Sequence, residues 1–147
     1  TLGALAAAGA IAPPVVVAVP ASPERADEYG VAGVPDFAGR GARAARFQAC
    51  LVDSVLPAMR RRYGIGLAAA RTGIFGASLG GLCAFDTAWR HAHVFGLVGV
   101  FSGALWWRGD DTDAAAQQAS RIVHARVRAT ARRPELRIGQ DLEPDAG

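Results

Sequence analysis

The chain has 147 residues, of which 51% are hydrophobic and 20% charged, and this is the size and content of one globular domain. The composition excludes an intrinsically disordered chain, because disordered segments are poor in apolar residues. The net charge of +3 comes from short arginine runs near expected helix ends, so we expect no nucleic-acid partner. Two cysteines are too few for a disulfide scaffold, and we expect Cys50 and Cys83 to be buried and reduced.

Residues 1–19 carry no charged side chain, so they must be considered as a membrane or export segment. A membrane-spanning helix needs about 20 apolar residues, and Pro13 and Pro14 interrupt this stretch in its middle. No basic residues precede it, as they would in a signal peptide. We therefore expect a short helix over residues 2–10, a turn, a buried strand over residues 15–19, and no membrane partner.

Residues 20–41 contain three prolines and four glycines, which predicts a long loop. Loops of this length inside compact domains are usually functional or mobile. From residue 42 to residue 63 the apolar positions recur every three or four residues, which predicts an amphipathic helix. Gly64 is placed to end this helix, and Pro57 is expected to kink it.

Strands and helices alternate in the rest of the chain. Short apolar runs predict strands over residues 72–76 and 95–101 and a fourth strand that opens at Leu136, with helices over residues 79–89 and 114–132 between them. Because buried strands alternate with helices, we expect an α/β domain with a mostly parallel sheet. Helices on both faces would make it a three-layer α/β/α sandwich.

One motif carries chemistry. Residues 76–81 read Gly-Ala-Ser-Leu-Gly-Gly, which matches G-x-S-x-G between a predicted strand and a predicted helix. In that context the pattern indicates a nucleophile elbow, a strained turn that presents a serine at the N-terminus of a helix. Ser78 is therefore the candidate nucleophile, and the backbone N–H of Leu79 is a candidate oxyanion-hole donor. An ordinary glycine-rich turn between a strand and a helix is the alternative.

Three further stretches accompany the serine motif. They are Ser-Gly-Ala-Leu-Trp-Trp at residues 102–107, Arg-Ala-Asp-Glu-Tyr at residues 25–29, and the Leu-Pro…Tyr end of the helix at residues 56–63. Together these motifs resemble the Putative esterase family of the α/β-hydrolase fold, and they are closest to its branch of enterochelin (ferric-siderophore) esterases. The resemblance covers roughly residues 2–145. It implies a serine esterase that acts on a small-molecule ester, such as a ferric siderophore, without a metal or cofactor.

The resemblance also implies the catalytic roles of particular residues. The family uses a serine nucleophile, which corresponds to Ser78, a histidine base, and in many members a carboxylate that orients the histidine. The carboxylate would be Asp141 or Glu143, and the proline after Glu143 favours the latter. The family's histidine lies beyond the last strand, near the C-terminus, and no histidine of this chain corresponds to it. We therefore expect residues 1–147 to be one partial α/β-hydrolase domain, truncated at both ends and lacking the base.

The three histidines of the chain are poor substitutes for that base. His91 and His93 lie where the helix after Ser78 is expected to end, and His124 lies in the middle of a predicted helix. Surface or capping roles are expected for all three. The pair His91 and His93 has no third ligand at a suitable spacing, so we expect no metal site.

Substrate contacts are expected from residues that flank the nucleophile in the resemblance. Arg25 would meet an anionic or catecholate-bearing substrate, unless it forms a salt bridge with Glu28. Trp106 and Trp107 would form an aromatic wall beside the serine, unless they are core residues. Other carboxylesterase activities, of the feruloyl or acetyl-xylan type, remain open, as does a non-catalytic hydrolase-like protein used for binding or acyl transfer. A cytoplasmic location is expected.

Overall fold

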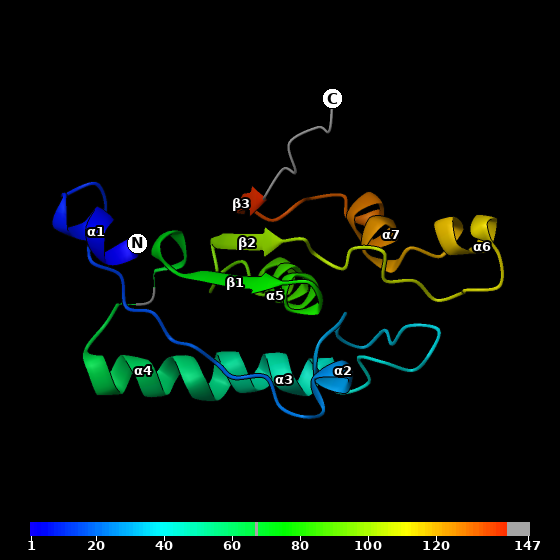
Figure 1. The fold of residues 1–147 in the computed structure, drawn as a ribbon, viewed down its shortest axis with the longest axis horizontal. Helices are drawn as coiled ribbons and strands as arrows, with labels where there is room; N and C mark the ends of the chain where they lie inside the picture. Colours follow the sequence, from blue (N-terminus) through cyan, green and yellow to red (C-terminus); the bar gives the residue numbers. More distant parts are fainter. Residues whose placement is uncertain (67, 141–147) are drawn as a thin grey trace.

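Short apolar runs form a parallel sheet at the centre of the molecule (Figure 1). The computed structural model describes residues 1–66 and 68–140. The strands lie in the order β1–β2–β3 and are β1 (Gly73–Ala77), β2 (Leu97–Phe101) and β3 (Arg137–Gln140). Both pairings are parallel, with Gly73 opposite Leu97 and Leu97 opposite Arg137. The prediction of an α/β domain with a parallel sheet is confirmed.

Helices precede the sheet and connect its strands. Before the sheet come α1 (Leu2–Ala7), α2 (Arg25–Glu28), α3 (Ala44–Cys50), the π-helical turn η1 (Leu51–Val55), α4 (Leu56–Tyr63) and the 3-10 turn η2 (Ala69–Arg71). Between the strands come α5 (Leu79–Arg90), α6 (Ala114–Ala119) and α7 (Ile122–Ala129). The helices predicted over residues 42–63 and 79–89 begin and end within two residues of the observed bounds, whereas α1 ends three residues before its predicted end and the helix predicted over residues 114–132 is divided into α6 and α7.

The helix predicted over residues 42–63 is one rod with a π-helical turn in its middle. Pro57 has no N–H to donate to the carbonyl of Asp53, and its ring crowds that carbonyl. The chain widens there, so that the N–H of Leu56 donates to the carbonyl of Leu51, five residues back. Gly64 ends the rod in the left-handed conformation, at φ 62°, as predicted.

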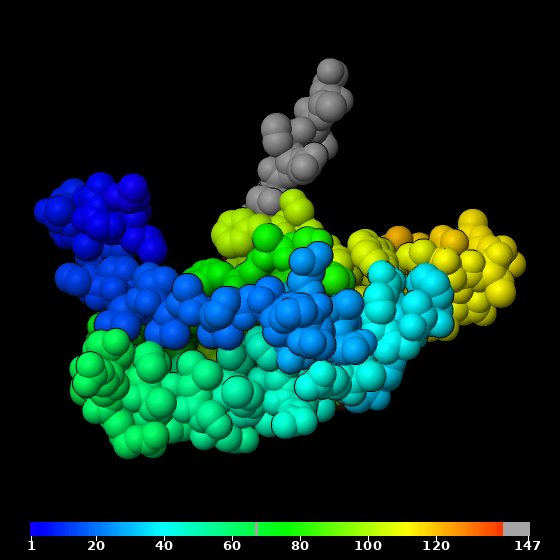
Figure 2. All heavy atoms as spheres, turned by 60° about the horizontal axis from the view of Figure 1, so that its bottom comes forward, coloured from blue at the N-terminus to red at the C-terminus, as the bar shows by residue number. Residues whose placement is uncertain are grey.

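The strand predicted over residues 15–19 is wrong. This segment pairs with no described strand, and its valines are 40–68% exposed. A β-branched run becomes a strand only where a neighbouring strand takes its hydrogen bonds, and no described strand lies beside this one. The segment instead runs from α1 to α2 in an irregular conformation, and Figure 2 shows it as a ridge of blue atoms beside α3 and α4.

Two further sequence expectations are corrected by tertiary contacts. The helix predicted over residues 114–132 breaks at Arg121, which forms an isolated antiparallel bridge with Arg108, while the N–H of Ile122 donates to the carbonyl of Trp107 (2.9 Å). Cys50, expected to be buried, is exposed, because it lies on the outer side of α3; Cys83 is buried as predicted. Both thiols are free.

The core lies on one face of the sheet. One cluster joins the sheet to α5 and the segment after it, through Ala84, Ala88, Phe95, Val98 and Val100. A second joins α5, α7 and the two loops that follow α2 and β2, through Val31, Leu82, Ala104, Trp107 and Val123. The loop predicted over residues 20–41 is therefore packed, with Val31 fully buried. On the opposite face Phe75 and Phe101 are 65% and 48% exposed, and no described helix covers them.

Candidate active site

Ser78 forms a strained turn between β1 and α5. Its backbone lies at φ 53° and ψ −121°, a region that residues with a Cβ rarely adopt, and its side chain is exposed. Hydrogen bonds hold the turn on both sides. The Ser78 N–H donates to the carbonyl of Phe101 (3.0 Å), and the Ser78 carbonyl accepts from the N–H groups of Gly81, Leu82 and Ala104. This is the geometry that a nucleophile elbow requires.

Two glycines make the turn possible by close approach. A Cβ on Gly76 would lie 2.1 Å from the carbonyl oxygen of Gly80, so no larger residue fits at this position, two residues before the serine. A Cβ on Gly81 would lie 3.0 Å from the carbonyl oxygen of Gly76 and 3.1 Å from the Cα of Gly103. Gly80 itself has more room, with its nearest neighbour at 3.8 Å. Gly81, outside the five-residue motif, therefore matters more to packing than Gly80.

The N-terminus of α5 supplies a candidate oxyanion-hole donor. Leu79 is the first residue of this 12-residue helix, so its N–H has no acceptor within the helix. Among the described residues nothing else accepts a hydrogen bond from it. An unsatisfied N–H at the positive end of a helix dipole favours negative charge next to Ser78. The turn can thus stabilise an oxyanion that forms on a substrate bound at Ser78.

Tyr29 lies against the elbow, which the sequence did not predict. Its Cε2 is 3.8 Å from the position of a Cβ on Gly80, and its ring lies 5.2 Å from that of Phe47. Burial raises the pKa of Tyr29, the charges of Cys83 and Glu28 act in the same direction, and Arg25 opposes them. The Arg-Ala-Asp-Glu-Tyr motif at residues 25–29 is the sequence feature from which the position of Tyr29 could have been predicted.

Arg25 is exposed at the start of α2, on the same short stretch as Tyr29. The expected salt bridge with Glu28 does not form, because Glu28 accepts a hydrogen bond from the hydroxyl of Ser22 (2.6 Å) instead. Within the described part of the chain, the Arg25 guanidinium has no hydrogen-bond or ion-pair partner. It is therefore open to a ligand, and the role predicted for it remains a prediction.

The two tryptophans have different surroundings. Trp107 is fully buried, its Nε1–H donates to the carbonyl of Val34 (3.2 Å), and its ring occupies the space that a Cβ on Gly30 or Gly41 would need. Trp107 is thus a packing residue and cannot present a wall to a ligand. Trp106 is 40% exposed and is the one of the pair that solvent reaches.

No hydrogen bond joins Ser78 to a histidine among the described residues. His91 caps the far end of α5, which places it about 20 Å from Ser78 at 1.5 Å per helical residue. His93 pairs with His91, with ring centroids 6.0 Å apart. His124 lies on α7, and its buried Nδ1 has no hydrogen-bond partner among the described residues. Asp141 and Glu143, the two candidate acids, lie outside the described residues.

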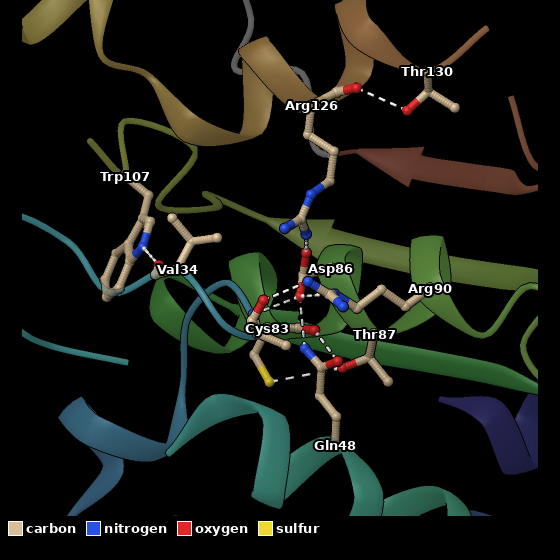
Figure 3. Close-up of polar contacts among 10 residues, drawn as sticks. Val34, Gln48, Cys83, Asp86, Thr87, Arg90, Trp107, Arg126 and Thr130 are labelled. Atoms are coloured by element: carbon tan, nitrogen blue, oxygen red, sulfur yellow. Dashed lines mark hydrogen bonds and ion pairs between the residues drawn. The ribbon is translucent and has the colours of Figure 1, made fainter. Parts of the chain in front are cut away.

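A buried carboxylate joins the elbow helix to the loop that carries Tyr29. Asp86 on α5 is 2% exposed and accepts hydrogen bonds from the N–H of Ala32 and the side chain of Gln48, both at 2.8 Å. It also forms ion pairs with Arg90 and Arg126 (Figure 3). Asp86 therefore ties α3, α5, α7 and the loop after α2 into one unit, which fixes the position of this loop against the elbow.

Neither a metal site nor a membrane span is found in the part of the chain that the structure describes. Nowhere in residues 1–66 and 68–140 do three or more potential metal-ligating side chains gather. No helix in those ranges is long and apolar enough to cross a membrane.

Comparison with known proteins assigns the family. The family described as Putative esterase matches residues 1–142, so the chain belongs to this family. Among solved structures it is similar to the enterobactin esterase FES from Shigella flexneri in the presence of 2,3-dihydroxy-N-benzoyl-glycine, at 27% identity and a TM-score of 0.54. That match covers 64% of this chain and 24% of the other. No curated protein matches the chain.

Two further structures of the Shigella flexneri enzyme are similar to the same degree. The structure in the presence of enterobactin matches at 27% identity and a TM-score of 0.52, and another enterochelin esterase structure matches at 26% and 0.53. Each covers 64% of this chain and 23% of the other chain. The matched part thus spans about a quarter of the length of these solved structures.

Proposed function

We propose that the protein is a serine carboxylic-ester hydrolase whose nucleophile is Ser78. The observation that carries the proposal is the backbone of Ser78, strained at φ 53° with an exposed side chain at the N-terminus of α5. A strained conformation of a residue other than glycine is costly, and it persists where function requires it. Membership of the esterase family supports the same chemistry.

The reaction proceeds in two steps through an acyl-enzyme. The Ser78 hydroxyl attacks the ester carbonyl while a histidine base takes its proton, and the N–H of Leu79 stabilises the oxyanion of the tetrahedral intermediate. The alcohol then leaves with a proton from the histidine, and water attacks the acyl-enzyme by the same route. Asp141 or Glu143 would orient the histidine. No metal or cofactor takes part in this proposal.

The histidine base is the part that the described residues do not bring to Ser78. His91 and His93 lie at the opposite end of α5, and a serine without an adjacent base is a weak nucleophile. We infer that a residue outside residues 1–147 supplies the base in the active enzyme, within a complete three-layer α/β-hydrolase domain. The isolated chain is then expected to be nearly inactive.

The substrate that we favour is a siderophore ester of the enterobactin type. Support comes from the similarity to the enterobactin esterase, one structure of which was obtained in the presence of enterobactin. The exposed Arg25, four residues before Tyr29, would meet the charge of such a ligand. Feruloyl and acetyl-xylan esters are the alternatives within the same chemistry.

Labelling with a fluorophosphonate probe tests the nucleophile. We expect the full-length protein to be modified at Ser78, and the Ser78→Ala variant to remain unmodified. Ser54→Ala, which removes an exposed serine of η1, is the matched control and should label like the parent protein. Failure of the parent protein to label would favour the non-catalytic binding alternative.

Hydrolysis of p-nitrophenyl acetate tests the missing base. Purified residues 1–147 should show little turnover that depends on Ser78, whereas the full-length protein should hydrolyse the ester at ordinary enzyme rates. Turnover by the isolated chain at such rates, lost in Ser78→Ala, would show that the described residues already hold a base.

A further inference from the structure

A second serine with a strained backbone follows the strand next to the elbow. In the part of the chain that the structure describes, Ser78 (φ 53°) and Ser102 (φ 44°) are the two residues other than glycine that have a positive φ. The strands β1 and β2 run parallel, with Ala77 opposite Phe101, so the two serines leave neighbouring strands at the same level (Figure 1). Strain of this kind persists only where the surrounding structure imposes it.

The segment that contains Ser102 holds the backbone of Ser78 on both sides. Before Ser102, the carbonyl of Phe101 accepts a hydrogen bond from the N–H of Ser78 (3.0 Å). After Ser102, the N–H of Ala104 donates to the carbonyl of Ser78 (3.0 Å). The chain must turn between these two hydrogen bonds, and the positive φ of Ser102 lies within that turn.

The far side of this turn is anchored in the core. Ala104 is 2% exposed, and its carbonyl accepts a hydrogen bond from the N–H of Trp107 (3.2 Å). Gly103 lies against the first turn of α5, since a Cβ on Gly81 would come within 3.1 Å of the Gly103 Cα. A Cβ on Gly103 would come within 2.4 Å of the Val100 side chain. The turn is therefore closely packed against both α5 and β2.

The side chain of Ser102 is exposed, so a slightly larger one would meet solvent rather than the core. A substitution there chiefly changes how readily the backbone adopts a positive φ. Glycine adopts it freely and asparagine more readily than most residues, whereas a β-branched residue does so at a high cost. The choice of substitution at this position thus separates the role of the backbone from that of the hydroxyl.

We propose that Ser102 is a positioning residue for the nucleophile: its positive φ sets the turn whose two hydrogen bonds hold Ser78 in its strained, exposed conformation. The inference rests on the proposed function and deepens it, because it concerns the reactivity of Ser78. Ser102 acts through the backbone of Ser78 rather than on the substrate. If the turn relaxes at Ser102, the Ser78 hydroxyl loses the orientation in which it attacks, and small displacements of a reacting group slow a reaction strongly.

The rate at which a fluorophosphonate probe labels the full-length protein tests this role. Ser102→Gly removes the hydroxyl and permits the positive φ, so Ser78 should be labelled within about twofold of the parent rate. Ser102→Thr keeps the hydroxyl but disfavours the positive φ, so labelling should be about tenfold slower. Ser54→Thr makes the same change at an exposed serine of η1 and should label at the parent rate.

The final extent of labelling distinguishes positioning from a loss of folded protein. Labelling of Ser102→Thr should be slow but should reach the same extent as in the parent protein. A lower final extent with an unchanged rate would show that Ser102 matters only for folding, and would overturn the proposal. Slow labelling in Ser102→Gly with normal labelling in Ser102→Thr would assign the effect to the hydroxyl and would also overturn it.

A second pair of variants keeps the test decisive if Ser102→Thr does not fold by circular dichroism. Ser102→Asn and Ser102→Ala both lack the hydroxyl, and asparagine adopts a positive φ more readily than alanine. The asparagine variant should therefore label faster, and equal or reversed rates would contradict the proposal. A parent protein that does not label at Ser78 would refute the proposed function. A parent that labels, with equal rates in Ser102→Gly and Ser102→Thr, would refute the positioning role alone.

Discussion

Single atoms decide the conformation at Ser78. The turn that exposes the serine requires the Gly80 carbonyl to approach Gly76 to a distance that no Cβ allows. The same contact explains why the sequence motif begins with glycine. It does not explain the second glycine of the motif, because Gly80 has ordinary van der Waals space around its Cα.

Alanine substitution should destabilise the fold strongly at Gly76 and only slightly at Gly80. We expect Gly76→Ala to lower the free energy of unfolding by about 3 kcal/mol or more, because overpacking against backbone atoms cannot relax. Gly80→Ala should change it by less than about 1 kcal/mol, since the new methyl meets only the Tyr29 ring at 3.8 Å. Urea unfolding of the two variants makes the comparison. Equal losses would show that the elbow packs differently.

The buried thiol of Cys83 links stability to alkaline pH. Burial raises the pKa of Cys83 from 9.0 to about 11, although hydrogen bonds from Thr87 and from the Gly30 backbone act in the opposite direction. Between these two values the unfolded chain loses the thiol proton while the folded chain keeps it. The free energy of unfolding should therefore fall by about 2 kcal/mol as the pH rises through this window.

Urea unfolding at about pH 8 and about pH 10.5 measures this loss. In Cys83→Ala most of the loss should disappear, leaving the part due to Tyr29, whose pKa is also raised by burial. The same pH dependence in Cys83→Ala and in the parent chain would contradict the assignment to this thiol.

At the scale of elements, α5 organises the molecule. Its N-terminus carries Ser78, its apolar side packs on the sheet, and Asp86 on its other side gathers the loop after α2, α3 and α7. Apolar contacts alone already hold α5 on the sheet. The polar contacts of Asp86 are what fix the loop that brings Tyr29 to the elbow.

Removing the charge of Asp86 should destabilise the folded protein strongly. Asp86→Asn leaves Arg90 and Arg126 without their anion, and burial already lowers the pKa of Arg126. We expect the free energy of unfolding to fall by about 3 kcal/mol. Asp53→Asn, at an exposed carboxylate of η1, should change it by less than about 0.5 kcal/mol. Similar losses in both variants, measured by urea unfolding, would contradict a special role for Asp86.

At the scale of the whole molecule, the sheet has one covered and one open face. Helix α5 packs on the face that carries Val98 and Val100, and Phe75 and Phe101 lie on the other. The ring of Phe75 lies over Gly99, where a Cβ would come within 2.2 Å of it, yet it stays 65% exposed. An apolar surface of this kind is rarely left in water.

The open face should bind a hydrophobic dye. We expect the purified chain to increase the fluorescence of anilinonaphthalene sulfonate, and the double variant Phe75→Ser, Phe101→Ser to lose most of that increase. The unfolding midpoint should change little, because both rings are exposed. Undiminished dye fluorescence in the variant would show that the dye binds elsewhere.

The sequence predicted what depends on near neighbours. Periodic apolar residues gave α3–α4 and α5, short apolar runs gave β1 and β2, and Gly76 with Ser78 gave the elbow, because helix, strand and turn propensities act over a few residues. The motifs also led to the family, which the comparison confirms. These features need only the local chain and its pattern.

Tertiary structure alone decided the rest. Val15–Val19 has the composition of a strand, but a strand needs a partner, and none of the described segments lies beside it. The break at Arg121, the burial of Trp107 between two glycines and the approach of Tyr29 to Gly80 all depend on segments distant in sequence. Local residues determined most of the helices and strands and where the nucleophile stands. Contacts across the fold determined which side chains surround it, because burial and pairing belong to the assembled chain.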